Sequence, residues 1–174
     1  LGSVDLRSAT DRAAATLTEQ GTGWGDLALN AGNNVTQVSA TDVSVYALNL
    51  RLEAVAGIGA ALNPVRTEIS VLAATTTSSN SIFINEVSAL TVGTVAPVAA
   101  NAVLVDGSLL VNTDLLSLIG ANSADDLVLV NTQGNVNVLS PVITRNGGNL
   151  FISSAADLIF DNRLDVTGSL TLVA

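Results

Sequence analysis

The chain has 174 residues, of which 48% are hydrophobic but only 3% aromatic, and its formal net charge is −9. This length allows one domain with a substantial core, although a globular enzyme of this size normally fills its centre with more large rings. Six arginines oppose 15 acidic residues, which argues against a surface for nucleic acid or an anionic membrane. Because cysteine and histidine are absent, a disulfide framework, a transition-metal site and a Ser-His-Asp nucleophile are excluded.

Residues 1–24 form the least regular part of the sequence. Val4-Asp5-Leu6 alternates like a strand, and residues 9–20 include an alanine run that could form a helical turn at one end of the structure. Residues 21–25 are glycine-rich, but no Gly-Lys-Ser/Thr follows, so the segment does not match a phosphate-binding loop. We interpret Trp24 as a packing residue rather than as a platform for a sugar ring.

A short apolar-x-apolar run recurs along the chain. Its clearest copies are Ile69-Ser70-Val71 and Leu90-Thr91-Val92, in which every second residue is apolar, as in a half-buried strand. Glycine stands two residues before five of nine such runs, where a turn into a strand often needs positive φ. The runs are spaced by roughly 21 residues, which is typical of a β-solenoid. Their first residues, used as anchors, are Val4, Leu27, Leu48, Ile69, Leu90, Leu109, Leu127, Leu150 and Leu170.

The sequence therefore predicts an all-β fold, a right-handed parallel β-helix of about eight coils with roughly 21 residues each. Residues 1–174 would form one β-solenoid segment, and the right hand follows the general rule for parallel crossovers. A β-sandwich and a leucine-rich repeat are the competing folds. Leucine-rich repeats keep Asn or Cys at one position per repeat, but here Asn30 and Asn112 share that position with Arg51, Gly93 and Ser153.

The most regular motifs lie between residues 25 and 95. Their order is Gly57-Ile58-Gly59, Asn63-Pro64-Val65-Arg66-Thr67, Leu72-Ala73-Ala74-Thr75, Ile82-Phe83-Ile84-Asn85 and Ala89-Leu90-Thr91-Val92-Gly93. This succession resembles repeats of filamentous-haemagglutinin-like proteins and related giant bacterial surface adhesins, and a weaker Gly-x-Leu-x-Leu theme continues to the end of the chain. The resemblance implies a right-handed parallel β-helix, export to the cell surface, and a role in adhesion or as an extended stalk.

Residues 87–105 contain no charged side chain and could be mistaken for a membrane span. The segment contains Pro97 and Asn101 and is rich in valine rather than leucine. These features favour two buried strands joined at Ala96-Pro97 over a transmembrane helix.

The two ends of the chain have the same form, since Gly168-Ser169-Leu170-Thr171-Leu172 repeats the pattern of Gly2-Ser3-Val4-Asp5-Leu6. The sequence lacks methionine, so we expect a mature product or an excerpt, and early charges interrupt any signal peptide.

Uncapped strands expose backbone N–H and C=O groups that favour pairing with a further strand. The expected partners are adjoining repeats or copies stacked end to end, and a host or neighbouring cell surface; nucleic acid and membrane insertion are not expected.

No catalytic, cofactor-binding or metal-binding residue is assigned from the sequence, and no cofactor is expected. Asp125-Asp126 is the only adjacent acidic pair, but neighbours on a strand point to opposite faces, so we interpret it as a solvated turn. Gly147-Gly148-Asn149 begins like a calcium-binding repeat but lacks its carboxylate, and Thr16-Leu17-Thr18 has no in-register partners for binding ice. The arginines, which a lyase-type site needs beside acidic residues, are scattered: Arg7, Arg12, Arg51, Arg66, Arg145 and Arg163.

The resemblance implies a non-enzymatic structural or adhesive segment of a large bacterial surface protein, acting as a rigid β-helical stalk or fibre, and the lack of a catalytic constellation in the sequence agrees with this expectation. One alternative is a self-assembling extracellular filament or sheath whose subunits stack through open ends. A polysaccharide lyase or hydrolase built on a β-helix is a second alternative. The resemblance implies an extracellular or cell-surface location, and the absence of cysteine suits a secreted bacterial chain that stays unfolded during export.

Overall fold

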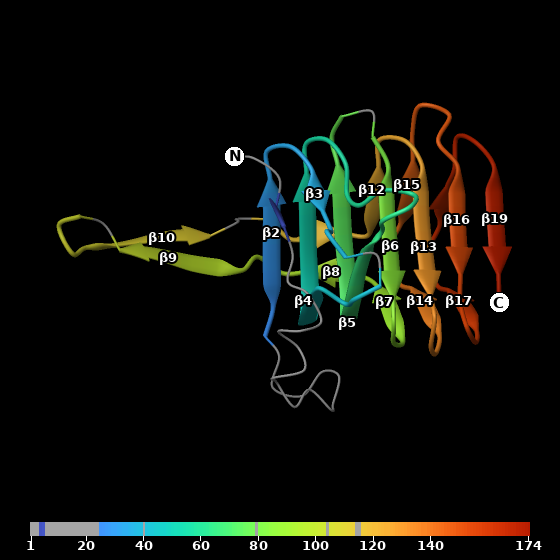
Figure 1. Ribbon diagram of the computed structural model, residues 1–174, viewed down its shortest axis with the longest axis horizontal. Coiled ribbons are helices and arrows are strands. Elements are labelled where there is room, and N and C mark those ends of the chain that lie inside the picture. Colours follow the sequence, from blue (N-terminus) through green and yellow to red (C-terminus); the bar gives the residue numbers. More distant parts are fainter. Residues whose placement is uncertain (1–3, 6–24, 40, 79, 104, 114–115) are drawn as a thin grey trace.

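The computed structural model describes residues 4–5, 25–39, 41–78, 80–103, 105–113 and 116–174. Within these ranges there is no helix, and parallel strands stack into a β-solenoid of about six turns (Figure 1). The predicted all-β solenoid is thereby confirmed; the possible helical turn in residues 9–20 and Trp24 lie outside the described residues. The strands are β1 (Val4–Asp5), β2 (Leu27–Ala31), β3 (Val35–Thr36), β4 (Val45–Ala54), β5 (Val65–Thr76), β6 (Ile82–Glu86), β7 (Leu90–Val92), β8 (Thr94–Val95), β9 (Ala99–Val103), β10 (Leu109–Thr113), β11 (Leu118–Ile119), β12 (Ala121–Ser123), β13 (Leu127–Asn131), β14 (Val136–Val138), β15 (Val142–Thr144), β16 (Leu150–Ser153), β17 (Leu158–Phe160), β18 (Leu164–Asp165) and β19 (Leu170–Val173).

Each regular coil carries three short strands, one on each of three faces. Strands β13, β14 and β15 form one coil, and each pairs in parallel with its counterpart in the next coil, β16, β17 and β18. Strand β5 is long enough to pair with β6, β7 and β12, so it passes along all three faces. We call this stack of coils the rod.

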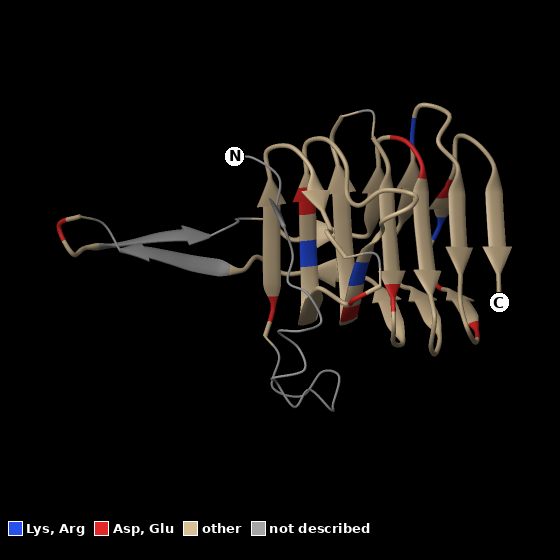
Figure 2. Ribbon diagram, in the orientation of Figure 1, with Lys and Arg blue, Asp and Glu red and all other residues tan. Residues whose placement is uncertain are grey.

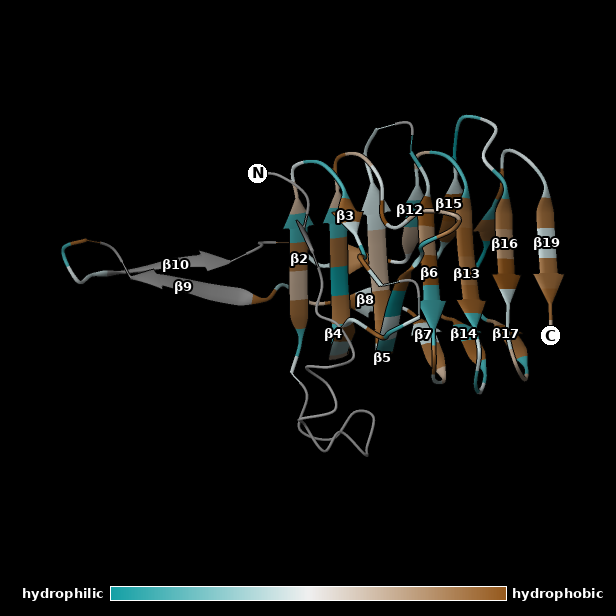
Figure 3. Cartoon of the chain, in the orientation of Figure 1, coloured by the Kyte–Doolittle hydropathy of each residue, from teal (hydrophilic) through white to brown (hydrophobic). Residues whose placement is uncertain are grey.

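Apolar side chains stack in columns inside the rod. In β13, Leu127 and Leu129 are buried while Val128 and Val130 between them are partly exposed, which follows the period of two of a strand. Strands of the rod are accordingly rich in hydrophobic residues, and the turns between them are more polar (Figure 3). One column contains Val35, Ile58, Ile82, Leu127, Leu150 and Leu170. Strand β1 continues its register, since Val4 pairs with Val35.

The rod has about six coils rather than the eight expected because the nine anchors do not form one column. Leu109 lies on β10, in an antiparallel hairpin outside the rod. Leu127, Leu150 and Leu170 share a column, whereas Leu90 pairs with Val136 on the next face. The spacing of about 21 residues thus continues across the hairpin, although the anchors after the hairpin lie on a different face of the rod from Leu90. Six coils at about 4.8 Å each give a rod of about 29 Å, compared with about 40 Å for eight coils.

The hairpin is an insertion between β7 and β12. Strands β8 and β11 pair antiparallel at its base, and β9 and β10 pair antiparallel beyond them. Figure 1 shows the hairpin leaving the rod and extending past the end at which β2 lies. The two strands expected within residues 87–105 therefore separate, because β7 belongs to the rod but β9 pairs antiparallel in the hairpin rather than joining the coil.

The coil closes underneath this insertion. The Gly120 N–H donates a 2.9 Å hydrogen bond to the Gly93 carbonyl, which brings the two ends of the hairpin together. A side chain on Gly120, where φ is +69°, would collide with the Pro141 carbonyl oxygen in the next coil. The Thr94 hydroxyl lies 3.3 Å from the Ser140 hydroxyl, so Thr94 occupies the position of Ser140 in this coil. Residues 95–119, which we call the arm, therefore leave and rejoin the coil at one corner. The base of the arm packs on the rod, since Val95 is 1% exposed and Arg51 donates a hydrogen bond to the Leu116 carbonyl.

We predict that deletion of the arm leaves a folded rod. The deletion would leave Val92 and Ala121 four positions apart, the same separation as between their partners Val138 and Val142 in the next coil. Loop closure depends only weakly on loop length, but the deletion also removes the buried Val95 and the hydrogen bond from Arg51 to the Leu116 carbonyl. The free energy of unfolding should therefore fall by about 2–4 kcal/mol. Chemical denaturation followed by circular dichroism measures this change. Loss of the cooperative transition would show that the arm is part of the core.

We also predict opposite outcomes for two adjacent residues of β13. Leu129 is 2% exposed inside the rod, whereas Val130 points outward. Leu129→Ala should lower the free energy of unfolding by about 2–5 kcal/mol because it leaves a cavity in the column. Val130→Ala should cost less than about 1 kcal/mol. Equal losses for the two variants, measured by equilibrium denaturation, would contradict the assignment of the inner face.

Candidate functional site

The acidic pair found in the sequence lies in the turn that follows β12. One carboxylate oxygen of Asp126 accepts hydrogen bonds from the backbone N–H and the side-chain amide of Asn149, at 2.7 and 2.9 Å. Asn149 in turn accepts a bond of 2.9 Å from the Ser169 N–H through its side-chain oxygen. Asp126, Asn149 and Ser169 therefore form a ladder that links turns of three successive coils.

The arginines do not converge on one place (Figure 2). Arg51 pairs with Glu53 at 2.7 Å and donates a 2.6 Å hydrogen bond to the Leu116 carbonyl. Arg66 lies on a different part of the rod, since it is in register with Asn85 whereas Arg51 is in register with Ala73. In the C-terminal coils Arg163 pairs with Asp165 at 3.1 Å, while Arg145 is exposed. Arg7, Arg12 and Thr16-Leu17-Thr18 lie outside the described residues.

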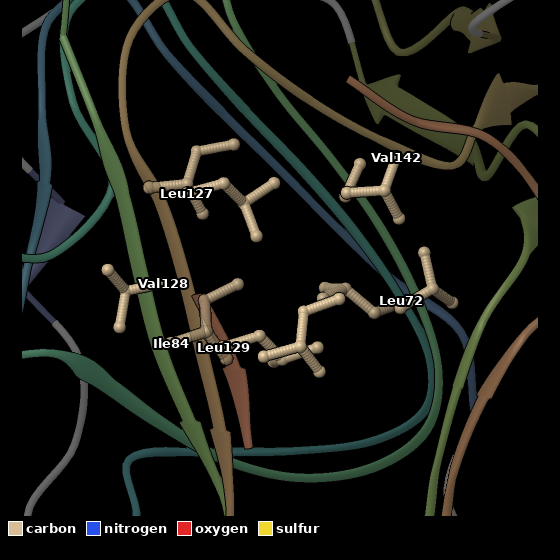
Figure 4. A pocket seen from close by; sticks show the side chains of 10 residues that line it. Leu72, Ile84, Leu127, Val128, Leu129 and Val142 are labelled. Carbon is tan, nitrogen blue, oxygen red and sulfur yellow. The ribbon is translucent and has the colours of Figure 1, made fainter. Parts of the chain in front are cut away.

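A small apolar void lies within the rod. Its volume is about 10 Å³, and Figure 4 shows Leu72, Leu127, Leu129 and Val142 among the side chains that surround it. All of the residues that line it are hydrophobic. A void of this size could hold at most one water molecule, which would lack polar partners there. Pockets for small organic ligands are at least about 300 Å³, so this void is a packing imperfection rather than a binding site.

The most unusual polar group in the rod is the carboxyl group of Glu86, which is 0% exposed at the end of β6. It accepts hydrogen bonds of 2.5 Å from the Thr67 hydroxyl, 3.3 Å from the Ile69 N–H, and 3.0 and 2.5 Å from the N–H and hydroxyl of Ser88. The register places Thr67 and Asn131 beside Glu86 in the coils before and after it. The Asn131 side-chain amide donates to the Ser88 carbonyl. We call these five residues the Glu86 corner.

Burial is the largest influence on the charge state of this group. It raises the pKa of Glu86 from 4.5 to about 7, although the hydrogen bonds from Ser88, Thr67 and Ile69 favour the charged form and act in the opposite direction. No salt bridge with a described residue compensates the carboxylate. Near neutral pH the Glu86 corner therefore holds a proton that an exposed glutamate would release.

Hydroxyl groups occupy the corresponding positions at another corner of the rod. The Thr76, Ser123 and Thr144 side chains donate to the carbonyls of Asn80, Asp126 and Gly148, at 3.0, 2.7 and 2.8 Å. Each of these side chains is at most 6% exposed and bonds a carbonyl three or four residues further along the chain. These hydrogen bonds fix the backbone of the turns at this corner, which is a structural role.

The Glu86 corner was not singled out from the sequence, although a signal for it exists. In Ile82-Phe83-Ile84-Asn85-Glu86 the alternation that points both isoleucines inward also points Glu86 inward. The same apolar-x-apolar-x-polar pattern recurs in 127–131, which ends at Asn131, and in 150–154, which ends at Ser154. A polar residue in the last inward position therefore identifies the corner of a coil.

Among the described residues, no three Asp, Glu, His or Cys side chains lie close enough together to hold a metal ion. The same residues include no helix with the length and hydropathy needed to cross a bilayer. No protein-family model, curated protein or solved structure matches the chain.

We predict that the stability of the protein falls between pH 5 and pH 8 because of Glu86. Since the folded state binds this proton more tightly than the unfolded chain does, the contribution is complete below pH 4.5 and is lost as the pH rises through about 7. The loss should amount to about 3 kcal/mol in the free energy of unfolding. Glu86→Gln keeps the shape but cannot ionise, and should remove this part of the pH dependence.

Urea denaturation at a series of pH values measures the effect. Asp161→Asn serves as the control because Asp161 is exposed, and this variant should keep the pH dependence of the wild type. An unchanged slope in Glu86→Gln would show that the carboxylate is accommodated without a raised pKa.

Proposed function

We propose that this chain is a rigid, non-enzymatic segment of a large extracellular bacterial surface protein, in which the β-solenoid acts as a stalk or fibre with a structural or adhesive role. The packing of the buried side chains among the described residues supports this proposal. The buried apolar side chains form continuous columns along the rod, and most of the buried polar ones satisfy backbone groups at its corners. This arrangement gives length and stiffness, as expected of a repeat protein whose coils contact only their neighbours.

The coil that contains β19 presents exposed apolar side chains. Strand β19 repeats the register of β16, but Leu170, Leu172 and Val173 are 48, 40 and 45% exposed. The column-mates Leu150 and Ile152 in the preceding coil are at most 1% exposed. A coil with the same pattern, from the same polypeptide or from another copy, would bury this surface and extend the sheet.

This exposed coil also favours the alternative of a self-assembling extracellular filament, in which separate copies stack end to end. Electron microscopy of the purified chain separates the two possibilities, because a filament subunit forms long fibres whereas a stalk segment remains short. A β-helical polysaccharide lyase is a weaker alternative. Two of the described arginines, Arg51 and Arg163, each pair with a carboxylate of their own segment and not with an acidic cluster.

The cell-surface role predicts that antibodies against this chain label intact cells of the source bacterium. In immunogold electron microscopy the label should lie outside the cell envelope without permeabilisation. An antibody against a cytoplasmic protein provides the control and should label only permeabilised cells. Label that appears only after permeabilisation would contradict the proposal.

A further inference from the structure

The turn between β15 and β16 contains an Asn-Gly sequence. Asn146 is the only asparagine in the chain that is followed by glycine, and both residues are exposed. The φ angles of Asn146 and Gly147 are +54° and +82°, and the Gly148 N–H donates a 2.8 Å hydrogen bond to the Arg145 carbonyl, as in a type I′ turn. Asparagine loses its side-chain amide most readily before glycine, because no side chain on the next residue hinders the reaction.

This loss, deamidation, proceeds through a succinimide ring. The backbone nitrogen of Gly147 bonds to Cγ of Asn146, the bond from Cγ to Nδ2 breaks, and the proton of the Gly147 N–H leaves with the side-chain nitrogen as ammonia. One water molecule then opens the ring to aspartate or to isoaspartate, in which the backbone runs through the side chain. The reaction therefore needs a Gly147 nitrogen that is free to turn toward the Asn146 side chain.

The fold holds both of the groups that must react. The Asn146 side-chain amide donates a 2.7 Å hydrogen bond to the Ala124 carbonyl, in the turn of the preceding coil. The Gly147 N–H donates a 3.1 Å bond to the hydroxyl of Thr167, in the turn of the following coil. Figure 1 shows the loops before β13, β16 and β19 following one another along one edge of the rod. The Asn-Gly turn is thus held between its two neighbours.

The Thr167 hydroxyl is itself fixed in place. It donates a 3.3 Å hydrogen bond to the Thr144 carbonyl, and the Thr167 N–H donates a 3.3 Å bond to the Thr144 hydroxyl. The oxygen of Thr167 therefore presents a lone pair to the Gly147 N–H. Turning the Gly147 nitrogen toward the Asn146 side chain breaks this contact between coils.

We propose that Asn146 is a deamidation site that the turn of the following coil, residues 166–169, keeps from reacting. While Thr167 holds the Gly147 N–H, the amide of Asn146 is retained, and when the turn lifts away the amide is lost. Opening is easiest where little apolar surface is buried. The coil after this turn fits that description, since Leu170 and Leu172 are 48 and 40% exposed.

Closing the turn again does not reverse the modification. A carboxylate at position 146 has no hydrogen to donate to the Ala124 carbonyl, and the two oxygens repel each other. An isoaspartate also lengthens the backbone of a turn whose geometry is already fixed by its ends. The new charge adds to a chain whose net charge is −9. Deamidation therefore records that two coils have separated at this edge, and it favours their further separation.

Mass spectrometry of proteolytic fragments, after incubation of the 174-residue chain at mildly alkaline pH, measures the reaction as a gain of about one dalton at residue 146. The folded chain should react at least about tenfold more slowly than the chain in guanidinium chloride. Thr167→Val removes the acceptor for the Gly147 N–H and should raise the rate about fivefold, as expected from the loss of one hydrogen bond. Thr171→Val makes the same change on the exposed side of β19 and should react like the wild type.

Hydrogen exchange at the Gly147 N–H provides a second measurement that needs no variant, and its protection should match the slowing of deamidation. Exchange as fast as in an unstructured peptide would show that Thr167 does not hold this nitrogen, and would overturn the proposal. Equal deamidation rates in the folded and unfolded chains would remove any role of the coils. Equal rates in Thr167→Val and Thr171→Val would show that the Thr167 hydroxyl is not the protecting group.

Discussion

The structure depends on satisfying backbone groups at the corners of each coil. Along the faces, parallel ladders pair nearly every N–H and C=O, but at a corner the chain turns and the ladder stops. The rod places a short polar side chain at the last inward position before the turn, such as Ser123 or Thr144. This side chain donates to a carbonyl of the turn that also accepts a backbone N–H from a neighbouring coil or turn. Because each coil stacks on the next, a polar residue at one corner favours a polar residue above and below it.

Glu86 shows how strongly this constraint acts. The same corner is filled by Asn131 in the next coil and by Ser154 in the coil after that, both neutral. A charged carboxyl group at that depth is costly. Four hydrogen-bond donors reduce this cost, and burial raises the pKa of Glu86 to about 7, so that the group is mostly neutral at lower pH. The stacked geometry thus determines where the side chain lies, and the charge state of the side chain adjusts to the position rather than the reverse.

Period and alternation were sufficient to predict the fold class, because both are local properties that a parallel solenoid repeats in every coil. They were not sufficient for the number of coils. Leu109 and Leu127 continue the expected spacing, yet one belongs to an antiparallel hairpin and the other to a face of the rod. Hairpin strands and solenoid strands have the same alternation, and only the long-range pairing distinguishes them. The inward direction of the Glu86 side chain could have been predicted from the alternation of β6. The pKa of Glu86 depends on burial, which only the stacking of coils produces.

The arm illustrates why a solenoid tolerates additions at a corner more readily than on a face. On a face, an extra residue would shift every later side chain from inside to outside. At the corner between β7 and β12 the added chain leaves and returns through Gly93 and Gly120, whose backbone hydrogen bond restores the path of the coil. The register of β14 with β7 and of β15 with β12 is consequently undisturbed by 25 added residues. The columns constrain the rod to one pattern, and the arm leaves that pattern at a corner, where it disturbs the register of neither neighbouring coil.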